Sequence, residues 1–290
     1  MRLTMTLLVK DEVDIIADNI RVHAALGVDN FVVMDNGSTD GTRELLASLA
    51  RDFEMTIIDR PVLDYQQSNW KTEMSRIATK KYGADWVITN DADEFWIPKE
   101  GDLKRELSAT GSIIACQRAN ILFSRKAFDE GGKYYEETNR VLYPIHYAEG
   151  IQEREEHLSI MLGEIHGKVM VRTLGLLRVK GGNHRAWHLW GWLNQCDSAN
   201  VMVYHFPIRS KQHFISNIEN RRALLKKGIT KMGSHYKRWV KMLEEGKLEE
   251  ELSRLVLDEN YERVLRNLGV VVEDHTPRNR IGKLLQPAGK

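Results

Sequence analysis

The chain has 290 residues, of which 42% are apolar and 29% charged, a composition typical of soluble globular proteins. This length accommodates one large α/β domain with an appendage, or two small domains. Lys and Arg number 42 against 41 Asp and Glu, so the net charge indicates no class of partner. Two cysteines, Cys116 and Cys196, exclude a disulfide framework and a CxxC metal site. Because no apolar run has the length of a signal peptide or of a membrane span, we expect a cytoplasmic protein.

The first third of the chain alternates between short apolar runs and amphipathic stretches. The apolar runs are rich in strand-forming residues, and the amphipathic stretches repeat apolar residues at helical spacing. We expect strands at 3–9, 31–34, 55–59 and 86–90, and helices at 15–26, 42–49 and 70–82. Short connections between alternating strands and helices predict an α/β fold with a mostly parallel central sheet and helices on both faces.

Polar and acidic residues follow these strands, at the edge where ligands bind in an open parallel sheet. The second strand leads into Asp35, and the fourth leads into Asp91, Asp93 and Glu94. Carboxylates at positions i and i+2 of an extended chain point to the same side. Asp91 and Asp93 can therefore share a hard divalent cation, Mg²⁺ or Mn²⁺, whose other positions are filled by phosphate oxygens.

Both acidic turns also have an interpretation without a ligand. Three carboxylates after a buried strand can form a solvated turn. After Asp35, the side chain of Asp40 can cap a helix that starts near Thr42, while Gly37 and Gly41 supply turn geometry.

Two common phosphate-binding signatures are missing. The first strand is not followed by G-x-G-x-x-G, and G-x-x-x-x-G-K-[ST] occurs nowhere. A bound diphosphate would therefore be held by a metal ion and basic side chains.

Four motifs occur in a fixed order within residues 3–96. They are Lys10-Asp11-Glu12, Gly27-Val28-Asp29, the stretch Val33 to Thr42, and the stretch Ala84 to Phe95. This series resembles the glycosyltransferase family 2 superfamily, in particular the subgroup with a D-x-D-E-F motif, and the last stretch is similar to family 92. The resemblance implies the Rossmann-like GT-A fold and transfer of a sugar from a nucleotide-sugar donor with Mn²⁺ or Mg²⁺.

The resemblance also implies roles for individual residues. In that family the D-x-D carboxylates hold the metal on the donor diphosphate, which here implies Asp91 and Asp93. The strand-end aspartate recognises the nucleoside, which implies Asp35. The end of the first strand lines the nucleoside pocket and places Lys10 and Glu12 nearby.

The second half of the chain carries further candidates. Lys168 can neutralise diphosphate charge, or it can be a surface lysine beside a strand. Transferases of this fold often supply a histidine late in the chain, and we expect His205 as a metal ligand and His184 as a donor contact. Glu149 and Asp197 are candidates for the base that deprotonates an acceptor hydroxyl. Solvated carboxylates and structural histidines are the alternatives.

Three tryptophans, Trp187, Trp190 and Trp192, fall within six residues. Aromatic faces stack on sugar rings, but large aromatic side chains more often lie in a core or an interface, and we expect a core here.

The domain boundaries follow from these patterns. We expect a catalytic domain at 1–210, with a nucleotide-sugar half at 1–96 and an acceptor half at 97–210, then an amphipathic helical extension at 211–275 and a flexible tail at 276–290. Residues 209–241 are strongly basic. They can contact the inner face of an anionic membrane, or they can form a solvated helical hairpin packed on the catalytic domain.

The leading hypothesis is a metal-dependent glycosyltransferase, inverting, that acts on a glycan or lipid-linked acceptor in cell-surface polysaccharide or glycolipid synthesis. A sugar nucleotidyltransferase is one alternative, although the Gly-rich N-terminal loop that such enzymes carry is missing. A non-catalytic GT-A-like scaffold or RNA-binding module is another. The chain has no aromatic-basic RNA motif, so a nucleic-acid partner is not expected.

Overall fold

The computed structural model describes residues 1–61, 66–108, 110–148, 159–191, 194–230 and 232–286, in two compact units. The first unit contains Met1–Arg118, His166–Tyr204 and Leu284–Lys290; the second contains Ala119–Ile165 and His205–Lys283. The chain thus leaves the first unit twice, whereas we expected a single boundary at residue 210. Two long strands, β6 (Ile113–Leu122) and β11 (Gln195–His205), carry the chain from one unit into the other.

The sheet of the first unit has the order β6-β8-β4-β1-β2-β3. Four strands are mutually parallel: β1 (Leu3–Val9), β2 (Asn30–Asp35), β3 (Met55–Asp59) and β4 (Trp86–Asn90). Strand β8 (Lys168–Arg172) pairs antiparallel with both β4 and β6. The expected parallel sheet is therefore confirmed over its first four strands, which are followed by an antiparallel edge.

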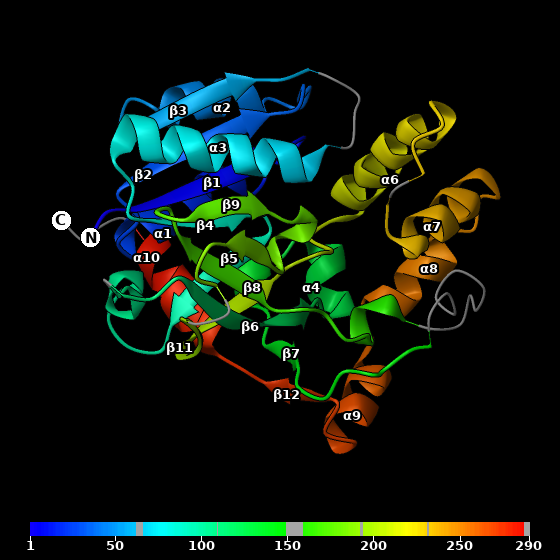
Figure 1. The fold of residues 1–290 in the computed structure, drawn as a ribbon. Helices are drawn as coiled ribbons and strands as arrows, with labels where there is room; N and C mark the ends of the chain where they lie inside the picture. The colour runs from blue at the N-terminus through cyan, green and yellow to red at the C-terminus, as the bar shows by residue number, and fades with distance from the viewer. Residues whose placement is uncertain (62–65, 109, 149–158, 192–193, 231, 287–290) are drawn as a thin grey trace. The chain divides into compact units, whose positions relative to one another are not determined.

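Three helices flank this sheet: α1 (Ile16–Ala25), α2 (Thr42–Leu49) and α3 (Gln67–Tyr82). Helix α3 lies in front of the sheet in Figure 1, and α2 lies behind it. The buried face of α3 carries Trp70, Met74 and Ala78, which pack with Val32 of β2 and Val87 of β4. Helices on both faces, connected in the order β-α-β, agree with the pattern that the sequence predicts.

Further short elements complete the first unit. They are β5 (Glu94–Pro98), the 3₁₀ turns η1 (Leu103–Glu106) and η4 (Gly181–Asn183), and a two-stranded antiparallel hairpin of β9 (Leu176–Val179) and β10 (Ala186–His188). Strand β11 pairs with β5 and β6. Because β5 begins at Glu94, the acidic motif occupies a tight turn between two strands.

The second unit begins with short elements and ends in helices. The first part has α4 (Arg125–Glu130), η2 (Tyr134–Glu136), β7 (Asn139–Val141) and η3 (Ile160–Leu162). The second part has α6 (Lys211–Lys226), α7 (Ser234–Glu244), α8 (Leu248–Leu255), α9 (Glu259–Asn267), β12 (Val271–Glu273) and the π-helical η5 (Arg278–Gly282). The short helix α10 (Lys283–Leu285) follows, and the chain returns to the first unit within it. The helical extension expected after residue 210 is present. No described helix combines the length and hydropathy needed to cross a membrane.

The end of the chain differs from the loose tail that we expected. Residues 278–285 are helical, and the side chain of Ile281 is fully buried. An apolar residue removed from water in this way anchors the segment, a feature that the Pro and Gly content of the stretch did not reveal.

His23 is buried in α1 as a neutral imidazole. Its Nε2 accepts a hydrogen bond from the backbone N–H of Trp96 (3.0 Å), while Nδ1 donates to the carbonyl oxygen of Asn19 (2.7 Å). Burial lowers the pKa of His23 to about 4, against a small opposing effect of the bond to Asn19. The unfolded chain therefore binds more protons than the folded chain between pH 6.5 and about 4.

We predict that the imidazole of His23 makes the free energy of unfolding fall as the pH drops from about 6.5 to about 4. The loss from this group alone reaches about 3 kcal/mol. Urea unfolding of the wild type and of His23→Gln, measured across this range, should show their stability difference shrinking toward acid pH.

The comparison between the two proteins isolates His23. His184 and His235, whose pKa values are also lowered to about 4 by burial, contribute equally to both proteins. Glu137, whose pKa burial raises to about 7, has the opposite pH dependence and cancels in the same way. Parallel stability profiles for the two proteins would contradict the prediction.

Candidate active site

The acidic turn and Asp35 lie at one edge of the sheet. Strand β1 lies between β2 and β4, and its Leu7 pairs with Asn90 while its Val9 pairs with Asp35. Because these three strands are parallel, Asp35 and the turn that starts at Asp91 follow neighbouring strands at the same carboxyl edge.

Two buried amides fix the backbone of the turn. Asn19 of α1 donates through Nδ2 to the carbonyl oxygens of Ala92 (2.8 Å) and Glu94 (2.9 Å). Asn90 of β4 donates to the Glu94 carbonyl (3.0 Å) and to Oδ1 of Asn19 (3.2 Å). Both amides are fully buried, so they satisfy carbonyl groups that neither strand ladder reaches.

Three cations surround the carboxylates of the turn. Lys71 of α3 lies 2.9 Å from Oδ1 of Asp91, and Lys168 of β8 lies 2.7 Å from Oδ2. Lys168 also lies 2.8 Å from Oε1 of Glu94, which accepts from Arg118 of β6 at 2.6 Å. The side chains of Lys71, Lys168 and Glu94 are each only 1% exposed. Three cations and two carboxylates leave this charged cluster with one net positive charge.

The lysines hold Asp91 ionised. Burial alone would raise the pKa of Asp91, but Lys168 and Lys71 outweigh it and hold that pKa well below its usual range. Each carboxylate oxygen therefore already accepts from an ammonium group. A divalent cation bound directly to Asp91 would face two positive charges within hydrogen-bond distance of its ligand. Asp93 lies in the same turn and is partly exposed.

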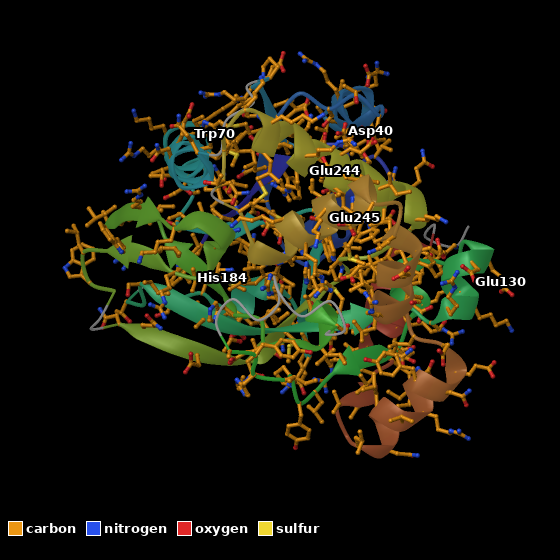
Figure 2. The ribbon with its side chains drawn as sticks, turned by 90° about the vertical axis from the view of Figure 1, so that its right-hand side faces the viewer. Asp40, Trp70, Glu130, His184, Glu244 and Glu245 are labelled. Atoms are coloured by element: carbon orange, nitrogen blue, oxygen red, sulfur yellow. The ribbon has the colours of Figure 1, made fainter. Side chains whose placement is uncertain are left out.

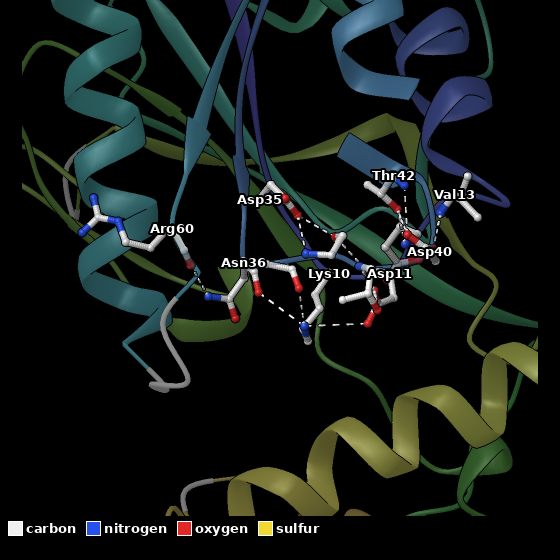
Figure 3. A network of polar contacts seen from close by, with 12 residues as sticks. Lys10, Asp11, Val13, Asp35, Asn36, Asp40, Thr42 and Arg60 are labelled. Carbon is white, nitrogen blue, oxygen red and sulfur yellow. Dashed lines mark hydrogen bonds and ion pairs between the residues drawn. The ribbon is translucent and has the colours of Figure 1, made fainter. Parts of the chain in front are cut away.

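The turn after β2 is organised by Asp35 and Lys10 (Figure 3). Oδ1 of Asp35 accepts from the backbone N–H (3.1 Å) and the hydroxyl (2.5 Å) of Ser38. Lys10 donates to the carbonyl oxygen of Gly37 at 2.8 Å, and Gly37 has the positive φ of 74° that such a tight turn favours. The other oxygen of Asp35, Oδ2, is buried without a hydrogen-bond donor among the described residues.

Asp40 and Asp11 tie this turn to the start of α1. Asp40 accepts from the backbone N–H groups of Thr42 (2.9 Å) and Val13 (3.0 Å), which supports the capping role considered for it. Asp11 has a positive φ of 56° and accepts from the backbone N–H of Thr39 at 2.7 Å. The backbone N–H of Glu12 donates to the Thr42 hydroxyl (2.9 Å). The end of β1 and the Asp35 turn thus form one hydrogen-bonded structure.

His184 stands close to the charged cluster. Its Nδ1 donates to the carbonyl oxygen of Gly167 (2.8 Å), which leaves Nε2 as the nitrogen with a lone pair. Burial, reinforced by the positive charge of Lys168, lowers the pKa of His184 to about 4. His184 is therefore neutral at physiological pH, and its Nε2 can accept a hydrogen bond there.

His205 belongs to the second unit, where its side chain has a defined orientation. Nδ1 lies 2.7 Å from Oδ1 of Asn120, whose amide donates to the carbonyl oxygen of Met161 (2.8 Å). Nδ1 is therefore the donor, and Nε2 carries the lone pair that a metal ligand requires. The role of His205 as a metal ligand stays a prediction.

The structure describes only one of the two candidates for the base that deprotonates the acceptor. Glu149 lies outside the described residues. Asp197 is exposed on β11. Both roles stay predictions.

The tryptophans of residues 187–192 do not form the core that we expected. Trp187 is 55% exposed and Trp190 is 41% exposed, while Trp192 lies outside the described residues. A hairpin of two short strands buries one face only, so residues on its outer face stay in water.

Sequence reasoning missed the side chains that hold the acidic turn: Asn19, Asn90, Lys71 and Arg118. Lys71 did leave a signal, because it follows Trp70 on the helix face that also carries Met74 and is thus a charged residue on an apolar face. Lys168 was identified, but its ammonium group bonds to Asp91 and Glu94.

Replacing Asn19 by leucine should lower the free energy of unfolding by about 3 kcal/mol, because the carbonyl group of Ala92 loses its donor, that of Glu94 loses one of two donors, and the Asn90 amide loses an acceptor. Chemical denaturation measures this loss. Asn69→Leu is the matched control, since Asn69 is exposed on α3, and it should change stability by no more than about 0.5 kcal/mol. Equal effects of both substitutions would show that the Asn19 contacts do not hold the turn.

Replacing Lys168 by methionine should cost about 3–5 kcal/mol, because the substitution takes a counter-ion from two carboxylates, one of them fully buried. The control is Lys104→Met. Lys104 pairs with Asp29 at 2.6 Å on the surface, where both side chains are about one third exposed. That pair should contribute about 0–1 kcal/mol. Thermal unfolding of both variants at neutral pH measures the contrast, and a loss at Lys168 no larger than at Lys104 would contradict it.

Comparisons with known proteins place this site in a family. The model of glycosyltransferase family 92 matches residues 5–173. A search among curated proteins finds no match. Among solved structures, S. aureus TarS 1-349 is 11% identical with a TM-score of 0.41, over 88% of this chain and 71% of that one. Glucosyl-3-phosphoglycerate synthase from Mycobacterium tuberculosis, in complex with Mg²⁺ and UDP, is 17% identical with a TM-score of 0.31, over 60% and 57%.

Both structural likenesses are distant, and the assignment comes from the family model. That match spans β1 to β8 and so includes the Asp35 turn, the acidic turn and the cations around it. A match over more than half of the sequence shows that the chain belongs to glycosyltransferase family 92 and is a glycosyltransferase.

Proposed function

We propose that this glycosyltransferase moves a sugar from a nucleoside-diphosphate donor to an acceptor hydroxyl with the help of Mn²⁺ or Mg²⁺, and with inversion at the transferred carbon. The observation that carries the proposal is the acidic turn, which is held rigid at the carboxyl edge of the sheet beside Asp35 by two buried amides and three cations. A donor site benefits from such rigidity, because groups that are already in place need no reorganisation when the reaction occurs.

Asp35 is the proposed contact for the nucleoside. Its Oδ2 is a buried acceptor with no donor among the described residues, and leaving such an atom unpaired costs about 1–3 kcal/mol. A ribose hydroxyl or a base N–H would supply the missing donor. Lys10 and Glu12 take part indirectly in this proposal, since the Lys10 ammonium group and the Glu12 N–H shape the turn.

The metal is proposed to bind through Asp93. The carboxylate chemistry of the turn fits Mg²⁺ or Mn²⁺, which prefer oxygen ligands. Lys71 and Lys168 engage Asp91, so in this proposal Asp91 accepts from hydroxyl groups of the donor, and the partly exposed Asp93 is the direct metal ligand. When bound, the metal would neutralise charge on the departing diphosphate.

The net positive charge of the cluster suits the same donor. The ammonium groups of Lys168 and Lys71 are paired with Asp91 and Glu94. In this proposal Lys168 therefore positions these carboxylates and contributes to the positive electrostatic potential at the site. Neutral His184 adds a lone pair near the cluster, suited to a donor hydroxyl. The base that deprotonates the acceptor is proposed to be Glu149 or Asp197.

The acceptor is proposed to be a glycan or a lipid-linked sugar, as in cell-surface polysaccharide or glycolipid synthesis. The peripheral membrane contact expected of residues 209–241 is a weaker part of the proposal. In that stretch Lys211, Arg222, Arg238 and Lys241 each form an ion pair with a glutamate of the same unit. Family membership favours sugar transfer over nucleotidyl transfer, and no observation favours a scaffold or an RNA-binding role.

We expect Asp93→Asn to lower turnover by about 10²–10³-fold and to abolish the Mn²⁺-dependent part of donor binding, because the substitution takes away the proposed metal ligand. The measurement is thermal unfolding with nucleotide sugars, with and without Mn²⁺, followed by turnover with the sugar that stabilises most.

Asp52→Asn is the control, since Asp52 is exposed in the loop after α2 and the variant should behave like the wild type. Asp93 is preferred over Asp91 for the test, because loss of Asp91 also takes a counter-ion from two buried lysines. A variant of Asp93 with unchanged turnover and metal response would overturn the proposed metal site.

A further inference from the structure

The β9–β10 hairpin of the first unit exposes large apolar side chains to water. Of the twelve large hydrophobic residues that are exposed in the described part of the chain, five lie between residues 174 and 190. They are Leu174 (61%), Leu177 (49%), Trp187 (55%), Leu189 (55%) and Trp190 (41%). Scattered single hydrophobic residues need no explanation on a protein surface, but a concentration of this kind marks an interaction site.

The hairpin has an inner and an outer face. Val179 pairs with Ala186 and is fully buried, and Leu176 and Ala186 pack on the core that includes Trp70 and Met74 of α3. The next pair in the register is Trp187 with Arg178, and both are exposed. The register shifts between Trp187 and His188, which interrupts the regular alternation of side chains at Leu177. Leu177 and Arg178 are therefore both exposed, and the hairpin is anchored on one side and presents the other to solvent. His184, labelled in Figure 2, marks the turn that joins the two strands.

The hairpin and the residues next to it in the sequence are also positively charged. Residues 172–191 contain no acidic residue and four basic ones: Arg172, Arg178, Lys180 and Arg185. Within the part of the chain that the structure describes, none of the four forms an ion pair. Arg178 bonds to Ser68 and Asn69 of α3, and Lys180 lies over the ring of Trp187 with its Nζ 5.6 Å from the centroid.

We propose that the outer face of the β9–β10 hairpin docks on the surface of an anionic lipid bilayer. Tryptophan prefers the boundary between headgroups and acyl chains, and leucine side chains gain by entering that boundary. Lys and Arg beside them reach back to lipid phosphates, each worth about fivefold in affinity for an anionic membrane. The leucine and tryptophan side chains match the apolar interior of such a membrane, and the basic side chains match the negative charge of its headgroups.

Two other partners fit less well. A glycan would stack on the tryptophan faces but would gain little from three exposed leucines. A second copy of the chain would bring four more basic residues against the first four, and this hairpin alone is smaller than the roughly 20–30 residues per partner of a stable interface. The proposal is independent of the donor chemistry, because no hairpin residue named in it takes part in the charged cluster.

The test is binding of the full chain to vesicles of phosphatidylcholine containing phosphatidylglycerol, measured by co-sedimentation. We expect the wild type to bind, and binding to fall as NaCl screens the charges. Lys180→Gln with Arg185→Gln should lower the partition coefficient by about 30-fold, from two charges at about fivefold each. Leu177→Ser with Leu189→Ser should lower the partition coefficient by at least about tenfold, since two leucine side chains that would enter the bilayer are lost.

Matched controls come from exposed residues of the second unit. Val264→Ser with Leu268→Ser alters two exposed apolar residues, one in α9 and one directly after it, and Lys126→Gln with Lys133→Gln alters two exposed lysines, one in α4 and one directly before η2. Both controls should bind like the wild type, and thermal unfolding should show all four variants folded.

Three results would overturn the proposal. One is a wild type that does not bind the anionic vesicles at low salt. Another is a loss of binding in the control variants but not in the hairpin variants, which would assign the contact to the second unit. The third is a wild-type dimer in light scattering that the leucine substitutions convert to a monomer without any change in vesicle binding, which would assign the face to self-association.

Discussion

The ionised Asp91 carboxylate between two buried lysines is the interaction on which the rest of the site depends. A buried ammonium group is tolerated only when a counter-ion is held against it, so Lys71 and Lys168 require Asp91 in its observed place as much as Asp91 requires them. Lys71 comes from α3 and Lys168 from β8, and both elements are therefore held against the end of β4. On the far side of the turn, Asn19 of α1 holds the backbone. The turn is thus fixed by elements on both faces of the sheet.

The strands and helices of the first half were predicted well, because the residue patterns that define them are local in the sequence. Apolar runs and helical spacing define the strands and helices of residues 3–90, and the order of those elements places every strand end at one edge. This reasoning identified Asp35 and the acidic turn without any knowledge of contacts. It could not supply Asn19 or Arg118, whose partners lie 73 and 24 residues away along the chain. Such roles depend on which side chains meet in three dimensions, and periodicity carries no record of that.

The structure of the second half was predicted less well, for a different physical reason. Several of its strands are short: β7, β10 and β12 have three residues each, too few for an alternating pattern to stand out. The same shortness explains the exposed tryptophans, because a narrow hairpin covers the core with one face and has nothing to bury the other. The helical end of the chain was mistaken for a tail because only a few buried residues, among them Ile281, anchor it. The residue composition of a stretch, averaged over many positions, does not reveal such a contact.

The two lysines also affect how the acidic turn is ordered. In an isolated D-x-D pair, a metal ion would be needed to relieve repulsion between the carboxylates, so the pair would be ordered only when the ion is bound. Here Lys71 and Lys168 neutralise Asp91 within the protein, and the amides of Asn19 and Asn90 fix the backbone between Asp91 and Glu94. The turn therefore has its final form before any ligand arrives. In the proposed function, the free energy of metal binding is then available for the charge on the departing diphosphate, and none of it is consumed in ordering the site.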